Sequence, residues 1–589
     1  MARHVLSLCV LLLSCVFVWA GDVAPTSAPA SAPVLPNYTQ QWNSITGSCI
    51  TAEGTEKLLA LIKQSKDVGC NHLVLNESGS YRIEFQKPEY FENVKKVLAF
   101  AKENNITLAM GMVSIGYSGT YFHYDVNWDN GNPAKNVPFI VAGKIAKPDP
   151  LAVPEIKNPS LQEVADGKLV GWDDTPAPAS LLDDQVLFQG KPSLKGGQPV
   201  TQNVKCEPFK HYRVTWYVKG PKHADDGSYF FKASSNSPTG HRYHTYTEPT
   251  IHPADKDGWS RYEVMFNTYE AEKMHVTFGG GKAGENWFAG LKVEPAGLLL
   301  VLHRPKLPFV VTSADGKTVY EEGKDFKQAI DPILARKPFP GDFPIDHEAP
   351  VLELTDGSRI QDGQKLLVSY FHHMSVYTDQ DDISMAEPAT WDVLTRSIKQ
   401  VIATWNTGHY FLNYDEIRMG GWEEMPDPSI KTMGQLLAWH FRKSYDLVKA
   451  SDPNATIYTW SDMFTPFHNA APKSHYYYVN GDWSGSWENF PKDVVIMMWY
   501  SPTPEGMRFF ADRGHKQILC GFYDGKSTAA MEKNIQHWIE MSRGIPGVEG
   551  FMYCTFQGNY ASMPEYFQLL RTYSQWAKLG EAGTAPKEH

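Results

Sequence analysis

The first part of the chain alternates short apolar runs with stretches of helical periodicity. This pattern predicts strands at residues 45–49, 72–76 and 106–113, and helices that begin near Thr55 and Pro88. In the second helix apolar residues return every three or four positions, which provides one face to bury. Repeated strand, helix, strand units are typical of a parallel sheet covered by helices.

The same alternation resumes near residue 365. Helices are predicted over residues 391–405 and 432–450. Strands are predicted over residues 366–371, 410–415, 456–460, 494–499, 517–523 and 548–553. With the first three, these make nine candidates for the eight strands of an α/β fold, a TIM-type (β/α)8 barrel. We therefore expect one of them, with residues 45–49 as the candidate, to be irregular or not a barrel strand. The barrel is expected to occupy residues 41–135 and 361–580.

Between these two parts the helical period disappears. Alternating, aromatic-rich strands are predicted at residues 212–218, 229–232, 261–266 and 274–278, separated by Gly, Pro, Asp and Ser turns. They predict an inserted all-β, jelly-roll-like sandwich over residues 150–300, placed after the third barrel strand. Residues 301–360 are expected to connect the sandwich back to the barrel through a hairpin that turns at residues 315–316.

The inserted segment resembles secreted carbohydrate-binding modules in its general order of strands. This resemblance implies either a sugar-binding platform, with Trp259 and Trp287 as its candidate rings, or a purely structural wing.

The amino terminus has the features of a secretory signal peptide. Arg3 precedes an apolar run that ends at Ala20, so residues 1–20 are expected to be removed and the protein to be secreted or periplasmic. Lipoprotein processing at Cys15 is the minor alternative, because the apolar run continues past that cysteine. Residues 21–40 are rich in Ala, Pro, Ser and Thr and predict a linker. No later segment is long and apolar enough to suggest a membrane span.

The composition limits the classes of molecule that the protein is expected to bind. The net charge of −11 over 589 residues comes without a basic block, which argues against nucleic acid. Aromatic residues make up 13% of the chain, including 17 Trp and 29 Tyr, and such rings suit the flat apolar faces of sugars. Five scattered cysteines remain after the signal peptide, so neither a disulfide framework nor a zinc site is predicted. No cofactor and no metal are expected.

Candidate chemistry lies where the predicted barrel strands end, since active sites of such barrels form at the carboxyl ends of the strands. Those positions hold His372, His373, Asp415, Glu416, Arg418, Trp460, Asp462, Trp499, Tyr500, Tyr523, Asp524, Tyr553, Thr555 and Gln557. Carboxylates among aromatic rings suit glycoside hydrolysis, in which one acid protonates the leaving oxygen and a second group stabilises or attacks the sugar. Adjacent histidines have the wrong spacing for a metal site.

The Asp415–Glu416 pair, the W-S-D-M run at residues 460–463 and the M-M-W-Y run at residues 497–500 resemble the family 20 glycoside hydrolases, the β-N-acetylhexosaminidases. The resemblance implies that Glu416 is the general acid and that Asp415 orients the 2-acetamido group of the substrate. The family usually has His-x-Gly-Gly before the pair, whereas this chain has F-L-N-Y at residues 411–414, a difference that bears on acetamido specificity.

The same resemblance implies several substrate-binding residues. Tryptophans 460 and 499 would form walls of the pocket, and a tyrosine, at 500 or 523, would supply a supporting hydroxyl. The full set that we expect to contact a carbohydrate substrate is Arg418, Trp460, Asp462, Trp499, Tyr500, Tyr523, His372 and Tyr553.

Three functions remain open from the sequence. A secreted glycoside hydrolase is the leading interpretation, and a non-catalytic glycan-binding protein with a degenerate barrel is the alternative. A metal-dependent carbohydrate esterase would need His372 or His373 to converge with Asp462 or Asp524. Adjacent residues of a regular strand point to opposite faces, so Asp415 and Glu416 can share a pocket only if the strand breaks near them.

Overall fold

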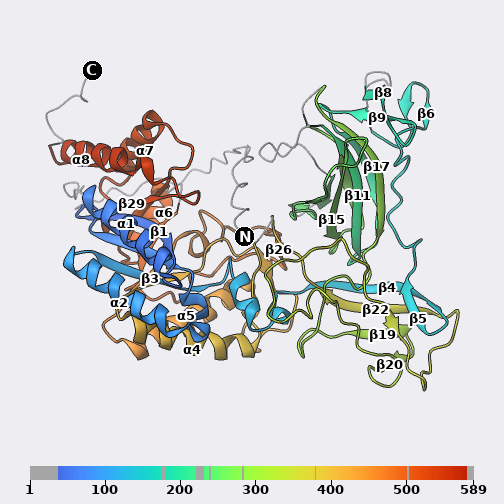
Figure 1. Ribbon diagram of the computed structural model, residues 1–589, viewed down its shortest axis with the longest axis horizontal. Helices are drawn as coiled ribbons and strands as arrows, with labels where there is room; N and C mark the ends of the chain where they lie inside the picture. The colour runs from blue at the N-terminus through green and yellow to red at the C-terminus, as the bar shows by residue number, and fades with distance from the viewer. Residues whose placement is uncertain are drawn as a thin grey trace, which may run out of the picture.

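The computed structural model describes residues 38–173, 181–220, 231–237, 240–281, 284–377, 380–499 and 503–579. The predicted signal peptide and nearly all of the linker lie outside these ranges. Eight parallel strands close into a barrel (Figure 1). In barrel order they are β1 (Gln40–Gly47), β2 (His72–Glu77), β3 (Thr107–Ser114), β23 (His409–Asn413), β25 (Thr456–Trp460), β27 (Val495–Met498), β28 (Gln517–Phe522) and β29 (Val548–Cys554). The predicted (β/α)8-type fold is thereby confirmed.

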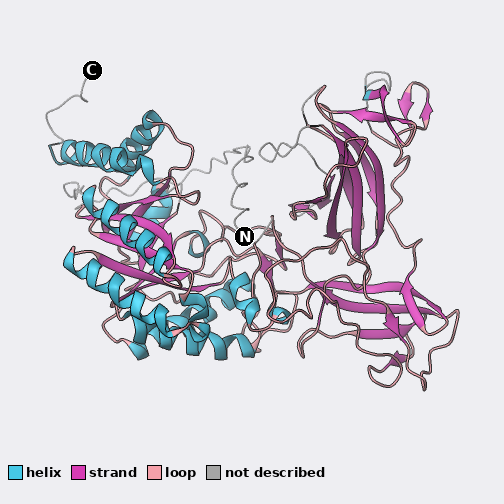
Figure 2. Ribbon diagram, in the orientation of Figure 1, coloured by secondary structure: helices cyan, strands magenta, loops and turns pink. Residues whose placement is uncertain are grey.

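Helices surround the barrel, and Figure 2 shows the long helices gathered around it. They are α1 (Ala52–Asp67), α2 (Pro88–Glu103), α4 (Pro388–Trp405), α5 (Met433–Ser451), α6 (Pro504–Ala511), α7 (Thr528–Met541) and α8 (Met563–Leu579). Their starts follow local chemistry: the hydroxyls of Thr51, Thr432, Thr503 and Ser527 accept backbone N–H groups of the first turn of α1, α5, α6 and α7. Within the described part of the chain, no helix is long and apolar enough to cross a membrane.

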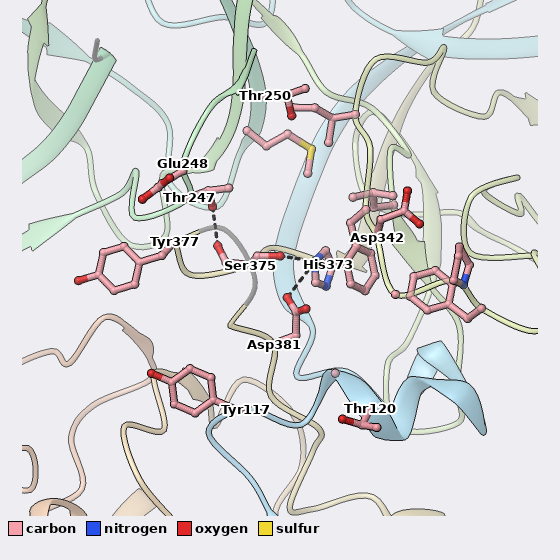
Figure 3. Close-up of a pocket in the computed structure, with 18 of the residues that line it drawn as sticks. Tyr117, Thr120, Thr247, Glu248, Thr250, Asp342, His373, Ser375, Tyr377 and Asp381 are labelled. Carbon is pink, nitrogen blue, oxygen red and sulfur yellow. Dashed lines mark hydrogen bonds and ion pairs between the residues drawn. The ribbon is translucent and has the colours of Figure 1, made fainter. Parts of the chain in front are cut away.

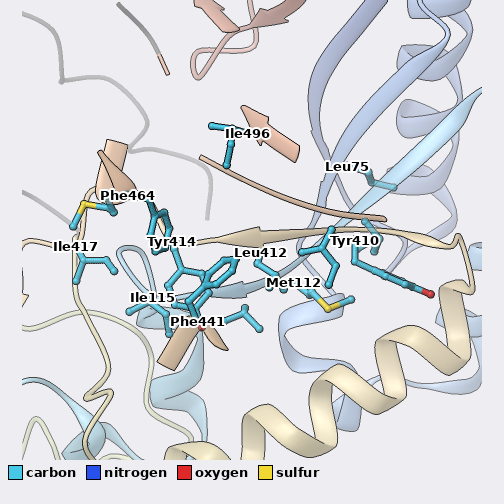
Figure 4. Packing of buried hydrophobic residues seen from close by; sticks show 14 of the residues in the cluster. Leu75, Met112, Ile115, Tyr410, Leu412, Tyr414, Ile417, Phe441, Phe464 and Ile496 are labelled. Carbon is cyan, nitrogen blue, oxygen red and sulfur yellow. The ribbon is translucent and has the colours of Figure 1, made fainter. Parts of the chain in front are cut away.

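Apolar side chains fill two separate layers. The barrel interior holds Trp42, Val74, Ala109, Phe411, Tyr458, Trp460, Val495, Met497, Ile518, Cys520, Met552 and Cys554. A second layer lies between strands and helices; Figure 4 shows Tyr410 and Leu412 of β23 there, with Phe441 of α5. Because Phe411 faces the interior and its two neighbours face the helices, β23 is buried on both faces. A continuous apolar run is what such a strand requires.

The insertion contains a β-sandwich, as predicted. One sheet has the order β10-β16-β12-β13 and the other β14-β15-β11-β17-β9-β8. The strands are β8 (Leu182–Phe188), β9 (Lys191–Lys195), β10 (Val200–Lys205), β11 (His211–Lys219), β12 (Phe231–Ser237), β13 (Gly240–Tyr243), β14 (Thr250–Ile251), β15 (Trp259–Asn267), β16 (Lys273–Phe278) and β17 (Trp287–Pro295). Of the two candidate platform rings, Trp259 is 3% exposed and packs on Phe188, while Trp287 is partly exposed and donates to Asp183. Trp259 therefore offers no open face to a sugar.

A third antiparallel sheet lies below the sandwich in the view of Figure 1, and both lie to one side of the barrel. It has the order β20-β19-β22-β4-β5-β21, with β18 added on β22. Its strands are β4 (Asn132–Ala142), β5 (Ile145–Pro148), β18 (Val301–Leu302), β19 (Val310–Ser313), β20 (Val319–Tyr320), β21 (Leu352–Glu353) and β22 (Lys365–His372). The pairing of β19 with β20 confirms the predicted hairpin.

This third sheet contains one of the nine strands that were predicted for the barrel. Residues 366–371 were predicted as a barrel strand, but β22 pairs antiparallel with β4, so that prediction is wrong. Buried and less buried positions alternate along β22, which is the pattern of a strand with one covered face. The expectation of an irregular strand at residues 45–49 is also wrong, since β1 pairs in regular parallel register with β2 and β29. The chain leaves the barrel after β3 and returns with α4.

Candidate active site

The predicted catalytic pair follows β23 at a break in the strand. The ladder slips between Leu412 and Asn413, and Glu416 adopts a left-handed conformation with φ 46°. Asp462, which follows β25, holds this turn: its Oδ2 accepts the Glu416 N–H at 2.9 Å and the Asn469 side-chain amide at 2.8 Å. A left-handed glutamate is strained and persists only where its surroundings impose it. The break that both carboxylates need in order to share a site is therefore present.

The carboxylate of Glu416 is held from two sides. Tyr117, which is 38% exposed, donates its hydroxyl to Oε2 at 2.5 Å. The guanidinium of Arg418 lies 3.0 Å from Oε1, and the Glu416 side chain keeps 21% of its surface exposed. Both oxygens thus accept donors while the group still reaches solvent.

Arg418 is a buried cation clamped between rings. It is 6% exposed, and its guanidinium lies 5.0 Å from the ring centre of Tyr377 and 4.9 Å from that of Tyr477. The side-chain oxygen of Gln380 accepts a hydrogen bond from Nη1. Such stacking and pairing fixes a planar guanidinium in one orientation, so Arg418 positions Glu416.

Asp415 is a carboxyl group whose surroundings strongly shift its pKa. Burial raises its pKa well above the ordinary range, and the negative charges of Asp462 and Glu416 add to that shift; Arg418 partly opposes it. A carboxyl group in such surroundings keeps its proton at pH values where an ordinary aspartate has lost it. The pair therefore combines a carboxyl group whose surroundings favour its protonated form with a glutamate that has a partner on both oxygens.

Gly116 sits against this turn. A Cβ atom built at Gly116 lies 1.8 Å from the carbonyl oxygen of Asp415 and 3.1 Å from the carbonyl carbon of Glu416. We expect Gly116→Ala to displace the catalytic turn, to cost about 2 kcal/mol of stability or more, and to impair activity. Gly357→Ala is the control, because a Cβ atom added there has nothing within 4 Å. Thermal unfolding of both variants tests this, and an unchanged melting temperature in Gly116→Ala would contradict it.

A second buried carboxyl group supports the segment that carries Arg418. Oδ2 of Asp382 accepts the backbone N–H groups of Arg418 at 3.0 Å and Met419 at 2.9 Å. Burial raises the pKa of Asp382 well above its usual value, and the native state therefore holds a proton that the unfolded chain releases. Its contribution to stability is complete below about pH 4 and is lost as the pH rises through the raised pKa.

Two substitutions at Asp382 separate the roles of its oxygen and its charge. Asp382→Asn keeps an acceptor for both N–H groups, so we expect little loss at low pH and a growing advantage over the wild type as the pH rises from about 4. Asp382→Ala leaves both donors unpaired and should cost about 3 kcal/mol relative to Asp382→Asn at any pH. Denaturant unfolding measured between pH 4 and 8 compares the three proteins; equal pH slopes for wild type and Asp382→Asn would refute the protonated state.

The predicted aromatic walls lie close to the site. Trp460 is 5% exposed in the barrel interior, 5.1 Å from Phe411 and 5.3 Å from Trp499 between ring centres. Trp499 is partly buried, and its ring centre lies 5.2 Å from that of Phe556, which is 56% exposed. Trp499 and Phe556 therefore form an apolar ledge at the barrel mouth, with Trp460 as its support. Tyr500 lies outside the described residues.

Three predicted substrate contacts lie elsewhere. Tyr523 is fully buried and donates its hydroxyl to Asn534 of α7, on the helix side of the barrel. Tyr553 stacks on Tyr523 at 5.2 Å and is likewise buried on that side. His372 ends β22 outside the barrel, and its ring stacks on His211 at 3.5 Å. The structure does not bring these three to the carboxylates, because the first two point outward from their strands and the third is not on a barrel strand.

Other residues at the site were not found from the sequence. Tyr117, Tyr377 and Gln380 contact Glu416 or Arg418, yet they stand on long connections after β3 and β22, where no periodicity identifies them. At the barrel mouth, the side-chain amide of Asn413 donates to the hydroxyl of Tyr81 at 2.8 Å. A polar residue at the end of an otherwise apolar strand is a signal that could have identified Asn413.

A cavity of about 800 Å³ opens beside this site (Figure 3). Tyr117 and Tyr377 belong to its wall and link it to Glu416 and Arg418. The sandwich contributes residues 247–250, and the connecting segment contributes residues 338–345. The sandwich and the connecting segment thus both contribute to the wall of this cavity. The wall contains aromatic rings, hydroxyl groups and charged groups. Among the described residues, no three His, Cys, Asp or Glu side chains are grouped so that they could hold a metal ion.

The fold and the site define an eight-stranded parallel barrel with a carboxylate-rich, aromatic-lined site at the carboxyl ends of its strands. No family model matches the chain, and no curated protein matches it. Solved structures do match. A rhamnosidase from a Novosphingobium species shares 10% identity at a TM-score of 0.33, and the alignment covers 92% of this chain and 59% of the rhamnosidase.

The names of two further matching structures both carry the label of glycoside hydrolase family 20. The chitobiase of Flavobacterium johnsoniae shares 12% identity at a TM-score of 0.25, covering 36% of this chain and 34% of that one. An exo-β-N-acetylglucosaminidase of Vibrio harveyi shares 8% identity at a TM-score of 0.27, covering 66% and 95%. The chain thus spans well under two thirds of the rhamnosidase and of the chitobiase. All three are glycoside hydrolases, but similarity at this level assigns neither a family nor an activity to this chain.

Proposed function

We propose that the protein is a glycoside hydrolase in which Asp415 and Glu416 form the catalytic pair and a carbohydrate is the substrate. The observation that carries this proposal is the contrast between two neighbouring carboxyl groups at the barrel mouth. Asp415 has a raised pKa because it is desolvated beside other carboxylates, while Glu416 is held by Tyr117 and Arg418. Glycoside hydrolysis needs this division between a proton donor and a carboxylate.

The difference between the two carboxyl groups also favours one assignment of the acid and the carboxylate to Asp415 and Glu416. Asp415 protonates the oxygen of the departing group, since burial and the neighbouring carboxylates raise its pKa and so favour its protonated form. Glu416 stabilises or attacks the positively charged anomeric carbon, for which a fixed carboxylate is suited. This reverses the roles implied by the resemblance to family 20, in which Glu416 would be the acid. Trp499 and Phe556 offer the apolar ledge on which a sugar ring packs.

The test is hydrolysis of a panel of chromogenic glycosides and soluble polysaccharides by the wild type and by Glu416→Gln. Plain hexosides, N-acetylglucosaminide and N-acetylgalactosaminide belong in the panel, because preference for the last two would support an acetamido-directed reaction. We expect the wild type to cleave at least one substrate and Glu416→Gln to lose about 10³-fold or more of that activity. Glu424→Gln, an exposed glutamate on the same loop, is the matched control.

Two outcomes would overturn the proposal. If Glu416→Gln retained the wild-type rate, the cleavage would arise elsewhere. If the wild type bound glycans from the panel but cleaved none of them, the protein would be a glycan-binding protein with a degenerate barrel.

A further inference from the structure

Two side chains of the cavity wall, His373 and Ser375, stand in a row with the buried Asp129 behind them, and the glycosidase reaction does not use these three residues. Oδ2 of Asp129 lies 2.8 Å from Nδ1 of His373, and Nε2 of the same ring lies 3.0 Å from Oγ of Ser375. Figure 3 shows His373 and Ser375 joined by this contact at the wall of the cavity. The three residues come from the segment before β4 and the segment after β22, which the third sheet brings side by side.

The two hydrogen bonds hold the histidine in the orientation of a general base. When Nδ1–H donates to the carboxylate of Asp129, Nε2 has a free lone pair and accepts the hydroxyl of Ser375. The ring cannot turn away, because it is 1% exposed and stacks on Phe343 with ring centres 3.4 Å apart. Burial lowers the pKa of His373 to about 4, so the ring is neutral at neutral pH and free to take a proton.

The charges around the histidine favour the proton transfer. A carboxylate oxygen of Asp381 lies 3.6 Å from Nε2, and its negative charge favours the protonated ring. Burial raises the pKa of Asp129 well above its ordinary value; Arg304, which donates to the backbone oxygen of Asp129, carries a positive charge that opposes this rise without cancelling it. The ring that receives the serine proton thus lies between the side chains of Asp129 and Asp381. Ser375 itself is only partly buried and faces the cavity.

We propose that Asp129, His373 and Ser375 form a second catalytic centre that hydrolyses O-acyl esters, with an O-acylated carbohydrate as the substrate held in the cavity. A serine whose hydroxyl meets a histidine oriented by a buried aspartate is the arrangement that activates a nucleophile for acyl transfer. Only the carbohydrate part of this substrate rests on the proposed glycosidase function. The ester chemistry rests on the three side chains alone.

The reaction balances with water as the only co-reactant. Oγ of Ser375 attacks the acyl carbonyl carbon while its proton passes to Nε2 of His373. The bond from that carbon to the sugar oxygen then breaks, and the sugar hydroxyl leaves with the proton from Nε2. Water attacks the acyl-serine and gives one proton to Nε2, which returns it to Oγ as the carboxylic acid departs. Asp129 holds the ring throughout and is not consumed.

The test measures ester hydrolysis and active-serine labelling on the whole protein. The substrates are p-nitrophenyl acetate and an O-acetylated methyl hexoside, and the label is an alkyl fluorophosphonate located by peptide mass spectrometry. We expect labelling at Ser375, and a fall of about 100-fold or more in both hydrolysis rates in Ser375→Ala. Folding should survive, because the hydrogen bond from Thr247 is accepted by the backbone oxygen of residue 375. Melting temperatures check this.

Two control variants test whether the ester hydrolysis and the labelling arise from this centre. Ser369→Ala changes a serine of β22 that is not part of the cavity wall, and it should keep the wild-type rates and labelling. Glu416→Gln should lose glycosidase activity and keep ester hydrolysis, so that each proposal can fail without the other. Ester hydrolysis that persists in Ser375→Ala, labelling at another residue, or a wild type that neither hydrolyses the esters nor reacts with the label would each overturn the second centre.

Discussion

Asp415→Asn is expected to lower kcat/KM for an alkyl glycoside by about 10²–10⁴-fold, the range for loss of a general acid. The amide fills nearly the same volume as the carboxyl group, but it has no proton to transfer to the leaving oxygen. Since burial and the charges of Asp462 and Glu416 are what keep the proton on Asp415, the substitution also removes an unfavourable group. We therefore expect the folded protein to be retained, with a melting temperature at least equal to that of the wild type.

The leaving group distinguishes the two members of the pair. A nitrophenolate leaves without protonation, so Asp415→Asn should retain far more activity on nitrophenyl glycosides than on alkyl glycosides. Glu416→Gln should lose activity on both, because the carbon centre needs its carboxylate whatever the leaving group. Steady-state kinetics with matched nitrophenyl and methyl glycosides of the preferred sugar provide the measurement. Equal losses on the two substrates in Asp415→Asn, with the leaving-group dependence appearing in Glu416→Gln instead, would restore the opposite assignment.

The barrel was predictable because its strands are buried on both faces. Continuous apolar runs such as residues 410–412, followed by helices with one apolar stripe, identify a parallel sheet without knowledge of tertiary contacts. The misplaced candidate, β22, has an alternating pattern of burial, and its assignment to the barrel came from its position between helical segments. Its sequence, K-L-L-V-S-Y-F-H, does not alternate between apolar and polar residues, so the antiparallel pairing became visible only in the structure.

The site was predictable only in part, for a related reason. A strand that is apolar on both faces does not show which of its residues point inward. In β29, Met552 and Cys554 face the barrel interior, so the intervening Tyr553 faces the helices. The same alternation around Cys520 sends Tyr523 outward. The carboxylates were identified because polar groups directly after an apolar strand are conspicuous.

Contacts made by loops that are distant in the sequence could not be predicted from sequence patterns. Tyr117 and Tyr377 stand 260 positions apart, and each reaches the site only because the third sheet and the sandwich fold back against the barrel. Similarly, Asp129 and His373 meet because β4 and β22 pair. The hydrophobic periodicity of these segments does not predict such contacts, because they depend on the pairing of strands far apart in the sequence.

Arg418→Met is expected to move the alkaline limb of the pH profile for kcat/KM to higher pH. The positive charge of Arg418 opposes the rise in the pKa of Asp415. Without that charge the pKa rises further. Activity that depends on protonated Asp415 is lost as the pH rises through this pKa, so a higher pKa places the loss at higher pH.

Arg418→Lys is the control for charge, because it keeps the cation while losing the planar guanidinium that stacks on Tyr377 and Tyr477. We expect its alkaline limb to stay near that of the wild type. Both variants should turn over more slowly, since Glu416 loses its 3.0 Å partner in one and its fixed geometry in the other. A shift of the limb therefore reports on charge, and a fall in rate reports on positioning. An alkaline limb that stayed in place in Arg418→Met would mean that a group outside this cluster sets it, and Asp415 would then not be the acid.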